Sequence, residues 1–172
     1  MSRLIVAPEF TSVMGPLIFL AGPIQGTHDW QSGAIGLIRS LTKDVNIASP
    51  RRPIETYGKD FPNQLYNEQV DWETYYLRRA SRQGAILFWL AWEREHSCKR
   101  AYAQTTRFEL AEWKKEYTRF EFDIFLAIGI EEGFTGARYI RRQFAQDCPR
   151  LTIHETLKET CCEAVRLALK QI

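Results

Sequence analysis

The sequence predicts an α/β fold: a single Rossmann-like or flavodoxin-like domain over residues 1–172, with a parallel sheet of about five strands and helices on both faces. Three observations support this prediction. Short apolar runs alternate with longer segments of helical periodicity along the chain. The strongest run, GAILFWLAW over residues 84–92, is apolar without alternation, which is typical of a parallel strand covered on both faces. Finally, 172 residues suit one core, and no internal repeat or low-complexity linker divides them.

Each element has its own signal. Gly-Pro ends the first apolar run, and Asp29 is placed to cap the helix that follows. The expected strands are 16–23, 45–50, 84–92, 121–130 and 150–154, and the expected helices are 29–43, 63–83, one opened by Thr105 or Thr106, one near 136–145 and one from about 155 to 170. RRPIETYGKDFP, over 51–62, reads as a polar loop. We expect PLIFLAG and AILFWL to be adjacent central strands.

Composition and charge narrow the classes of function. A net charge of +2 gives no reason to expect nucleic acid or an anionic membrane as a partner. No run reaches the roughly 18 apolar residues of a membrane span, and the N-terminus lacks the pattern of a signal peptide. The four cysteines have no C-x-x-C spacing, so we expect no metal site. Reduced thiols then favour a cytoplasmic location.

The ligand site is expected beyond the carboxyl ends of the strands, where strand order reverses. Two segments meet there: AGPIQGTHDW after the first strand, and the loop and helix start that follow residues 84–92. Neither a G-x-G-x-x-G fingerprint, a phosphate-binding P-loop nor a G-x-S-x-G elbow is present. Gly22 and Pro23 therefore predict a close backbone approach to a small ligand, without a pyrophosphate cradle.

Two carboxylates near this edge are candidates for catalysis, Glu109 and Asp71. Each also has a structural interpretation. Thr106-x-x-Glu109 has the spacing of a capping box, in which the glutamate stabilises a helix start. Asp71 is equally consistent with a solvated helix residue paired to Arg78. The residue types alone do not decide between these alternatives.

Three segments, LIFLAGPIQG, YNEQVDWETYYLRRASRQGAILFWL and TTRFELAEW, together resemble the nucleoside 2-deoxyribosyltransferase family, in particular its divergent branch. The resemblance implies that Glu109 attacks C1′ of a 2′-deoxynucleoside and forms a deoxyribosyl ester, while Asp71 protonates the departing base. Such chemistry needs no metal or organic cofactor. It does require that Glu109 be ionised while its partner holds a proton, so their pKa values should be pushed apart.

The resemblance also implies the rest of the site. Phe19 stands where better-known members carry a tyrosine, and AQTTRFE lacks the second aspartate that they have before the glutamate. Thr105 and Thr106 are expected to orient the carboxylate and the sugar hydroxyls. The residues expected to contact substrate are Phe19, Gly22, Pro23, Asp29, Trp30, Trp72, Trp89, Thr105 and Thr106, with the three tryptophans as candidate walls around the base.

The expected activity is therefore transfer of deoxyribose between nucleobases by a homo-oligomer, with 2′-deoxynucleosides and nucleobases as substrates. Two alternatives remain. One is a hydrolase of the N-glycosidic bond in (deoxy)nucleosides or nucleoside monophosphates. The other is a nucleotide-binding module without catalysis.

Overall fold

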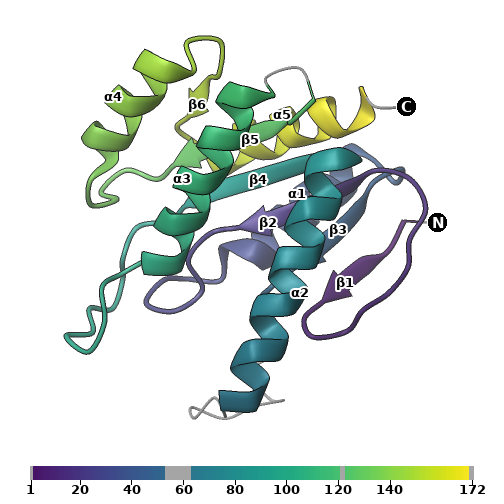
Figure 1. Cartoon of the computed structure of the whole chain (residues 1–172), viewed down its shortest axis with the longest axis horizontal. Helices are drawn as coiled ribbons and strands as arrows, with labels where there is room; N and C mark the ends of the chain where they lie inside the picture. The colour runs from purple at the N-terminus through teal and green to yellow at the C-terminus, as the bar shows by residue number, and fades with distance from the viewer. Residues whose placement is uncertain (1, 53–62, 121–122, 171–172) are drawn as a thin grey trace.

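The computed structural model describes residues 2–52, 63–120 and 123–170. Its strands form one sheet in the order β1-β3-β2-β4-β5-β6, and every neighbouring pair is parallel (Figure 1). The strands are β1 (Leu4–Val6), β2 (Leu17–Ala21), β3 (Asn46–Ser49), β4 (Gly84–Leu90), β5 (Leu126–Ile130) and β6 (Ile153–His154). The predicted α/β class is confirmed.

The predicted central pair is also confirmed, because β2 lies beside β4 with Phe19 opposite Ile86. Without β1, the order β3-β2-β4-β5-β6 is the flavodoxin order. β1 makes six strands where about five were expected. Its three residues, one of them the exposed Leu4, are too few to show a strand periodicity, and it is held by pairing with β3 at the sheet edge.

Helices cover both faces of the sheet, as predicted (Figure 1). One face carries α1 (Trp30–Leu41) and α5 (Leu157–Leu169), which bury Ile38 and Val165 against β2, β4 and β5. The other face carries α2 (Asn63–Arg82), α3 (Gln104–Arg119) and α4 (Ala137–Asp147).

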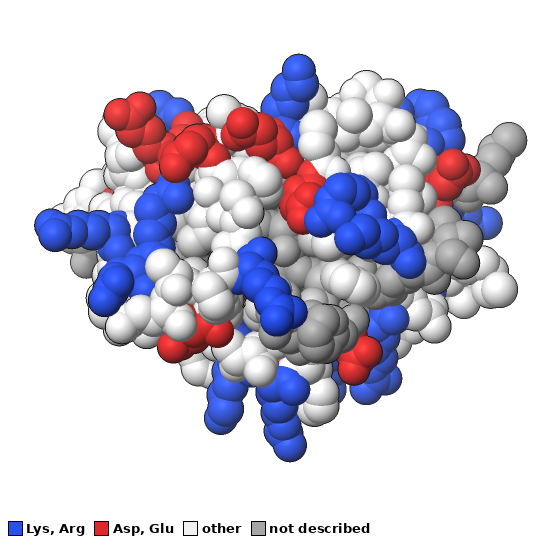
Figure 2. Space-filling view, turned by 90° about the horizontal axis from the view of Figure 1, so that it is seen from above, with Lys and Arg blue, Asp and Glu red and all other residues white. Residues whose placement is uncertain are grey.

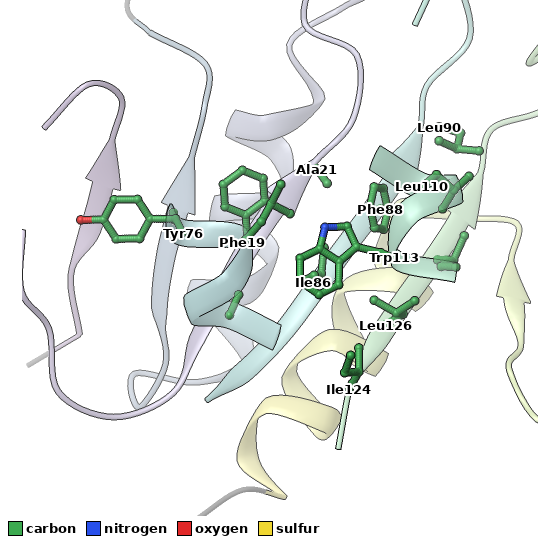
Figure 3. Close-up of a cluster of buried hydrophobic side chains, with 14 of the residues drawn as sticks. Phe19, Ala21, Tyr76, Ile86, Phe88, Leu90, Leu110, Trp113, Ile124 and Leu126 are labelled. Atoms are coloured by element: carbon green, nitrogen blue, oxygen red, sulfur yellow. The ribbon is translucent and has the colours of Figure 1, made fainter. Parts of the chain in front are cut away.

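On this second face, α2 and α3 are both anchored by aromatic residues. Trp72 of α2 is fully buried, and its ring centroid lies 5.9 Å from that of Phe19. Trp113 and Leu110 extend from α3 towards Ile86 and Phe88 of β4 (Figure 3). Both helices are therefore fixed on the sheet by side chains with large buried apolar area.

The helix starts show one confirmed cap and one wrong prediction. Asp29 caps α1, and its side chain accepts a hydrogen bond from the Ser32 amide. The helix that Thr105 or Thr106 was expected to open begins instead at Gln104, after Ala103, which has φ 54° and no capping side chain. Thr106 is buried within the first turn, so the predicted capping box with Glu109 does not form.

The loops at the carboxyl edge are tied to each other. The Gly26 carbonyl accepts hydrogen bonds from the amides of Arg94 and Glu95, and the Tyr102 hydroxyl donates to the Ala91 carbonyl. The segment after β2 and the segment that leads into α3 thus form one connected surface. Beyond Arg52, the loop expected over 51–62 lies outside the described residues.

On the face seen in Figure 2, Lys and Arg side chains are spread over most of the surface, with Asp and Glu side chains among them. Among the helices that the structure describes, none is long and apolar enough to cross a membrane.

Candidate active site between α2 and α3

A cavity of about 640 Å³ lies between α2 and α3. This volume falls within the roughly 300–1,000 Å³ of small-molecule sites. The lining residues recur every three or four positions on each helix, which places them on one stripe of α2 and one stripe of α3. They are Tyr66, Val70, Glu73, Thr74, Leu77 and Arg78 from α2, Arg100 from the preceding loop, and Gln104, Thr105, Phe108, Glu109, Glu112 and Trp113 from α3.

The cavity combines an apolar part with charged groups. Leu77 and Trp113 are buried and belong to the core beneath it. Tyr66 and Phe108 are 59% and 74% exposed, so their rings are accessible to a ligand. Such rings can stack on a flat heterocycle.

Glu109, one of the two predicted catalytic residues, lines this cavity and is partly buried. Burial raises the pKa of its carboxyl to about 8, with further contributions from the negative charges of Glu73 and Glu112. In the free protein at neutral pH, Glu109 is therefore largely protonated. This shift is opposite to the expectation that its surroundings keep it ionised.

Glu73 is the second carboxylate of the pair. It comes from the α2 stripe and is close enough to Glu109 for the two charges to repel. Burial raises the pKa of Glu73, while a hydrogen bond from Gln69 and the positive charge of Arg52 act in the opposite direction. Glu73 thus has a donor and a cation beside it, whereas the charged groups that shift Glu109 are both carboxylates. We expect Glu73 to ionise first.

Asp71, the other predicted catalytic residue, is exposed and does not line the cavity. Two residues correspond to a rotation of about 200° around a helix, so Asp71 and Glu73 lie on nearly opposite sides of α2. The structure brings Glu73, and not Asp71, to Glu109.

The predicted aromatic walls belong to the core instead. Trp30, Trp72, Trp89 and Phe19 are all buried, and none lines the cavity. The indole N–H groups of Trp30 and Trp72 donate to the carbonyls of Pro23 and Glu9. The rings that do face the cavity are those of Tyr66, Phe108 and Trp113.

Of the remaining predicted residues, only Thr105 lines the cavity. A Cβ added to Gly22 would lie 2.3 Å from the Trp89 carbonyl oxygen, so its close backbone approach is to β4 and not to a ligand. Asp29 caps α1 and forms an ion pair with Arg51. Gly22, Pro23 and Asp29 therefore make contacts among the loops at the carboxyl edge and not with the cavity.

Sequence reasoning missed Glu73, Gln69, Tyr66 and Phe108. One signal was available: Val70, Glu73, Leu77 and Arg78 share one helical face, and so do Thr105, Phe108, Glu109 and Glu112. Each of these two faces carries a carboxylate, and the two helices precede and follow the same strand in the sequence. This pattern could have indicated that Glu73 and Glu109 lie close together.

Within residues 2–52, 63–120 and 123–170, no group of three or more His, Cys, Asp or Glu side chains is arranged to hold a metal ion. No known protein-family model matches the sequence, and no curated protein matches it. The chemistry of the cavity is therefore the basis for a functional conclusion.

Proposed function

We propose that this protein cleaves the N-glycosidic bond of 2′-deoxynucleosides and transfers the deoxyribosyl group to another nucleobase. The observation that carries the proposal is the pair of coupled carboxylates, Glu73 and Glu109, in one cavity with accessible aromatic rings. The resemblance of the TTRFELAEW segment to deoxyribosyltransferases supports the same reaction. Glu109 is the nucleophile, and Glu73 takes the role that the resemblance assigned to Asp71.

The reaction has two displacements. A Glu109 carboxylate oxygen forms a bond to C1′ as the bond from C1′ to the base nitrogen breaks, and the bonding electrons leave with the base. Glu73 gives its proton to the base. In the second step an incoming base attacks C1′, returns a proton to Glu73 and releases Glu109. Two displacements retain the original anomeric configuration.

The roles of Glu73 as proton donor and Glu109 as nucleophile require the proton to be on Glu73 when substrate is bound. Between the two ionisations, the pair holds one proton. In the free protein we expect this proton on Glu109, whose pKa is raised to about 8, because Glu73 has a donor and a cation beside it. A bound base offers a lone pair beside Glu73, which stabilises the arrangement with the proton on Glu73 and leaves Glu109 ionised. Substrate binding thus prepares the nucleophile.

The aromatic rings supply the base site. Tyr66 and Phe108 stand on different helices at the same cavity, so a base can stack against either ring while its sugar faces the carboxylates. A stacked base also shields the ester from water, which favours transfer over hydrolysis.

A hydrolase of nucleoside monophosphates is the second candidate. The observation that favours it is the presence of Arg78 and Arg100 among the lining residues, since guanidinium groups recognise phosphate. Base release from a 2′-deoxynucleoside 5′-monophosphate but not from the corresponding nucleoside would select this candidate.

We also propose that the protein acts in the cytoplasm, because its four cysteines, which all lie within the described residues, form no disulfide.

The deciding experiment is mass spectrometry of the protein mixed with a 2′-deoxynucleoside and no acceptor base. We expect a deoxyribosyl adduct on the peptide that contains Glu109. Glu109→Gln should form no adduct and lose several orders of magnitude in rate, because the attacking charge is gone. Glu73→Gln should slow base release by about 10²–10⁴-fold.

Asp71→Asn is the matched control, since Asp71 is a carboxylate on α2 that lies outside the cavity. It should retain the wild-type rate. Full activity in Glu109→Gln, or an adduct on a peptide from outside the cavity, would show that the proposal is wrong.

A further inference from the structure

The side chain of Gln69 connects the end of β3 to the carboxylate pair. Arg52 Nε donates to Gln69 Oε1 at 2.6 Å, and Gln69 Nε2 donates to the Pro50 carbonyl at 3.0 Å and to Glu73 Oε1 at 2.6 Å. The Arg52 guanidinium is also hydrogen-bonded to α2, through the Leu65 carbonyl. The Gln69 amide thus has three hydrogen-bond partners: Pro50 at the end of β3, Glu73 on α2, and Arg52, which is itself hydrogen-bonded to α2.

These neighbours allow one orientation of the amide. The Arg52 guanidinium can only donate, and the Pro50 carbonyl can only accept. A flipped amide would place its N–H groups against the guanidinium and its oxygen against the carbonyl. Gln69 consequently presents only N–H to Glu73, and both of its hydrogens are used.

The fixed amide distinguishes the two oxygens of Glu73. Oε1 must accept from Gln69, so a proton on Glu73 is carried by Oε2. Oε1 still has a second lone pair for a ligand. The protonated Glu73 carboxyl thus presents a donor at Oε2 beside an acceptor at Oε1, the same pattern with which an asparagine side chain binds adenine.

We infer that Gln69 is a positioning residue that makes Glu73 select 6-aminopurines over 6-oxopurines. The inference rests on the proposed function in one respect, namely that Glu73 faces the base. When Oε2 donates its proton to purine N7, Oε1 lies beside the substituent at position 6. An amino group there donates to Oε1, whereas a carbonyl oxygen would face it acceptor to acceptor.

The same contact serves the reaction. Proton transfer from Oε2 to N7 lets the electrons of the bond between C1′ and N9 enter the ring, and the base departs as a neutral tautomer. Glu73 is left as a carboxylate whose Oε1 keeps the hydrogen bond from Gln69. Base selection and protonation of the leaving group are therefore two consequences of one hydrogen-bond pattern.

The test compares the binding of adenine and hypoxanthine, two purines that differ in their amino or oxo group at position 6. Isothermal titration calorimetry is done on the full-length protein, on Gln69→Met and on Asn67→Met. Methionine has the length of glutamine without its N–H groups. Asn67 is an exposed neighbour on α2 outside the cavity and is the matched control.

We expect the wild type and Asn67→Met to bind adenine at least about tenfold more tightly than hypoxanthine, and Gln69→Met to bind the two within about threefold. Equal binding of the two bases by the wild type, or no binding of either, would overturn the inference. So would a Gln69→Met protein that keeps the wild-type preference. Should Gln69→Met fail to fold by circular dichroism, Gln69→Leu replaces it, because leucine also has no hydrogen-bond donor and adds no charge beside Glu73.

Turnover of 2′-deoxyadenosine and 2′-deoxyinosine separates this inference from the proposed function. Release of both bases at equal rates, without an adenine preference in binding, would leave the proposed function standing and remove the role of Gln69. A preference for adenine in binding, without release of either base, would leave the role of Gln69 standing and remove the proposed function.

Discussion

Glu109 is the residue at which the proposed function and the stability of the fold are opposed. Its carboxyl is partly buried beside two other carboxylates, and its pKa is raised to about 8 from an ordinary value of 4.5. The folded protein therefore holds a proton that the unfolded chain has lost over the interval between these two values. In this window the contribution of Glu109 to the free energy of unfolding falls as pH rises.

The expected result is that Glu109→Gln is more stable than the wild type at neutral and alkaline pH. Glutamine needs no proton, so the cost of protonating the buried carboxyl at a pH well above its ordinary pKa disappears, and the gain is on the order of 3 kcal/mol at pH 7. At pH 4 the two proteins should be nearly equal in stability. Urea denaturation at pH 7 and pH 4 measures the difference. An equal free energy of unfolding for the two proteins at pH 7 would contradict the raised pKa.

At the scale of single residues, the sequence predicted one of the two carboxylates. Glu109 was identified because it lies in a segment that resembles a known one. Asp71 was predicted as the second catalytic residue, and Glu73 was not considered. The two are only two positions apart, but in a helix this displacement is nearly half a turn. Periodicity, which places Glu73 on the same face as Val70 and Leu77, carries the information that the resemblance lacked.

At the scale of elements, the apolar runs predicted the strands well because burial on both faces leaves few alternatives. The central pair, β2 and β4, was predicted from the apolar runs and the connection rules of α/β sheets, and is confirmed. Helix starts were harder to predict. α3 follows Ala103 in a left-handed conformation without a capping side chain, and no residue pattern indicates such a start. Thr105 and Thr106 therefore looked like caps although both lie within the helix.

The capping box is found at α5 instead. The Thr156 side chain accepts from the Glu159 amide, and the Glu159 carboxylate accepts from the Thr156 amide. Thr156→Ala should lower the free energy of unfolding by about 1 kcal/mol, since one amide loses its partner. Thermal or urea denaturation measures the loss. Thr152→Ala, at an exposed threonine nearby, is the control, and an equal loss in both variants would show that the box contributes nothing.

At the scale of the whole molecule, the rim of the cavity carries apolar side chains. Tyr66, Val70 and Phe108 are 59%, 39% and 74% exposed and lie on the two helices that enclose the cavity. The sequence predicted a homo-oligomer from its aromatic content, and this rim is the surface on which we expect it to form. Light scattering should show an assembly larger than a monomer at micromolar concentration, and a monomer alone would contradict this prediction.

The two edges of the sheet limit how copies of the chain can associate. β1 has three residues and β6 has two, so each edge offers very little unpaired backbone to another chain. A continuous sheet across two molecules would have to begin on one of these short strands. We therefore expect a homo-oligomer to form through side chains on the helices, and substitutions that alter oligomerisation should be sought on α2 and α3 and not along the strands.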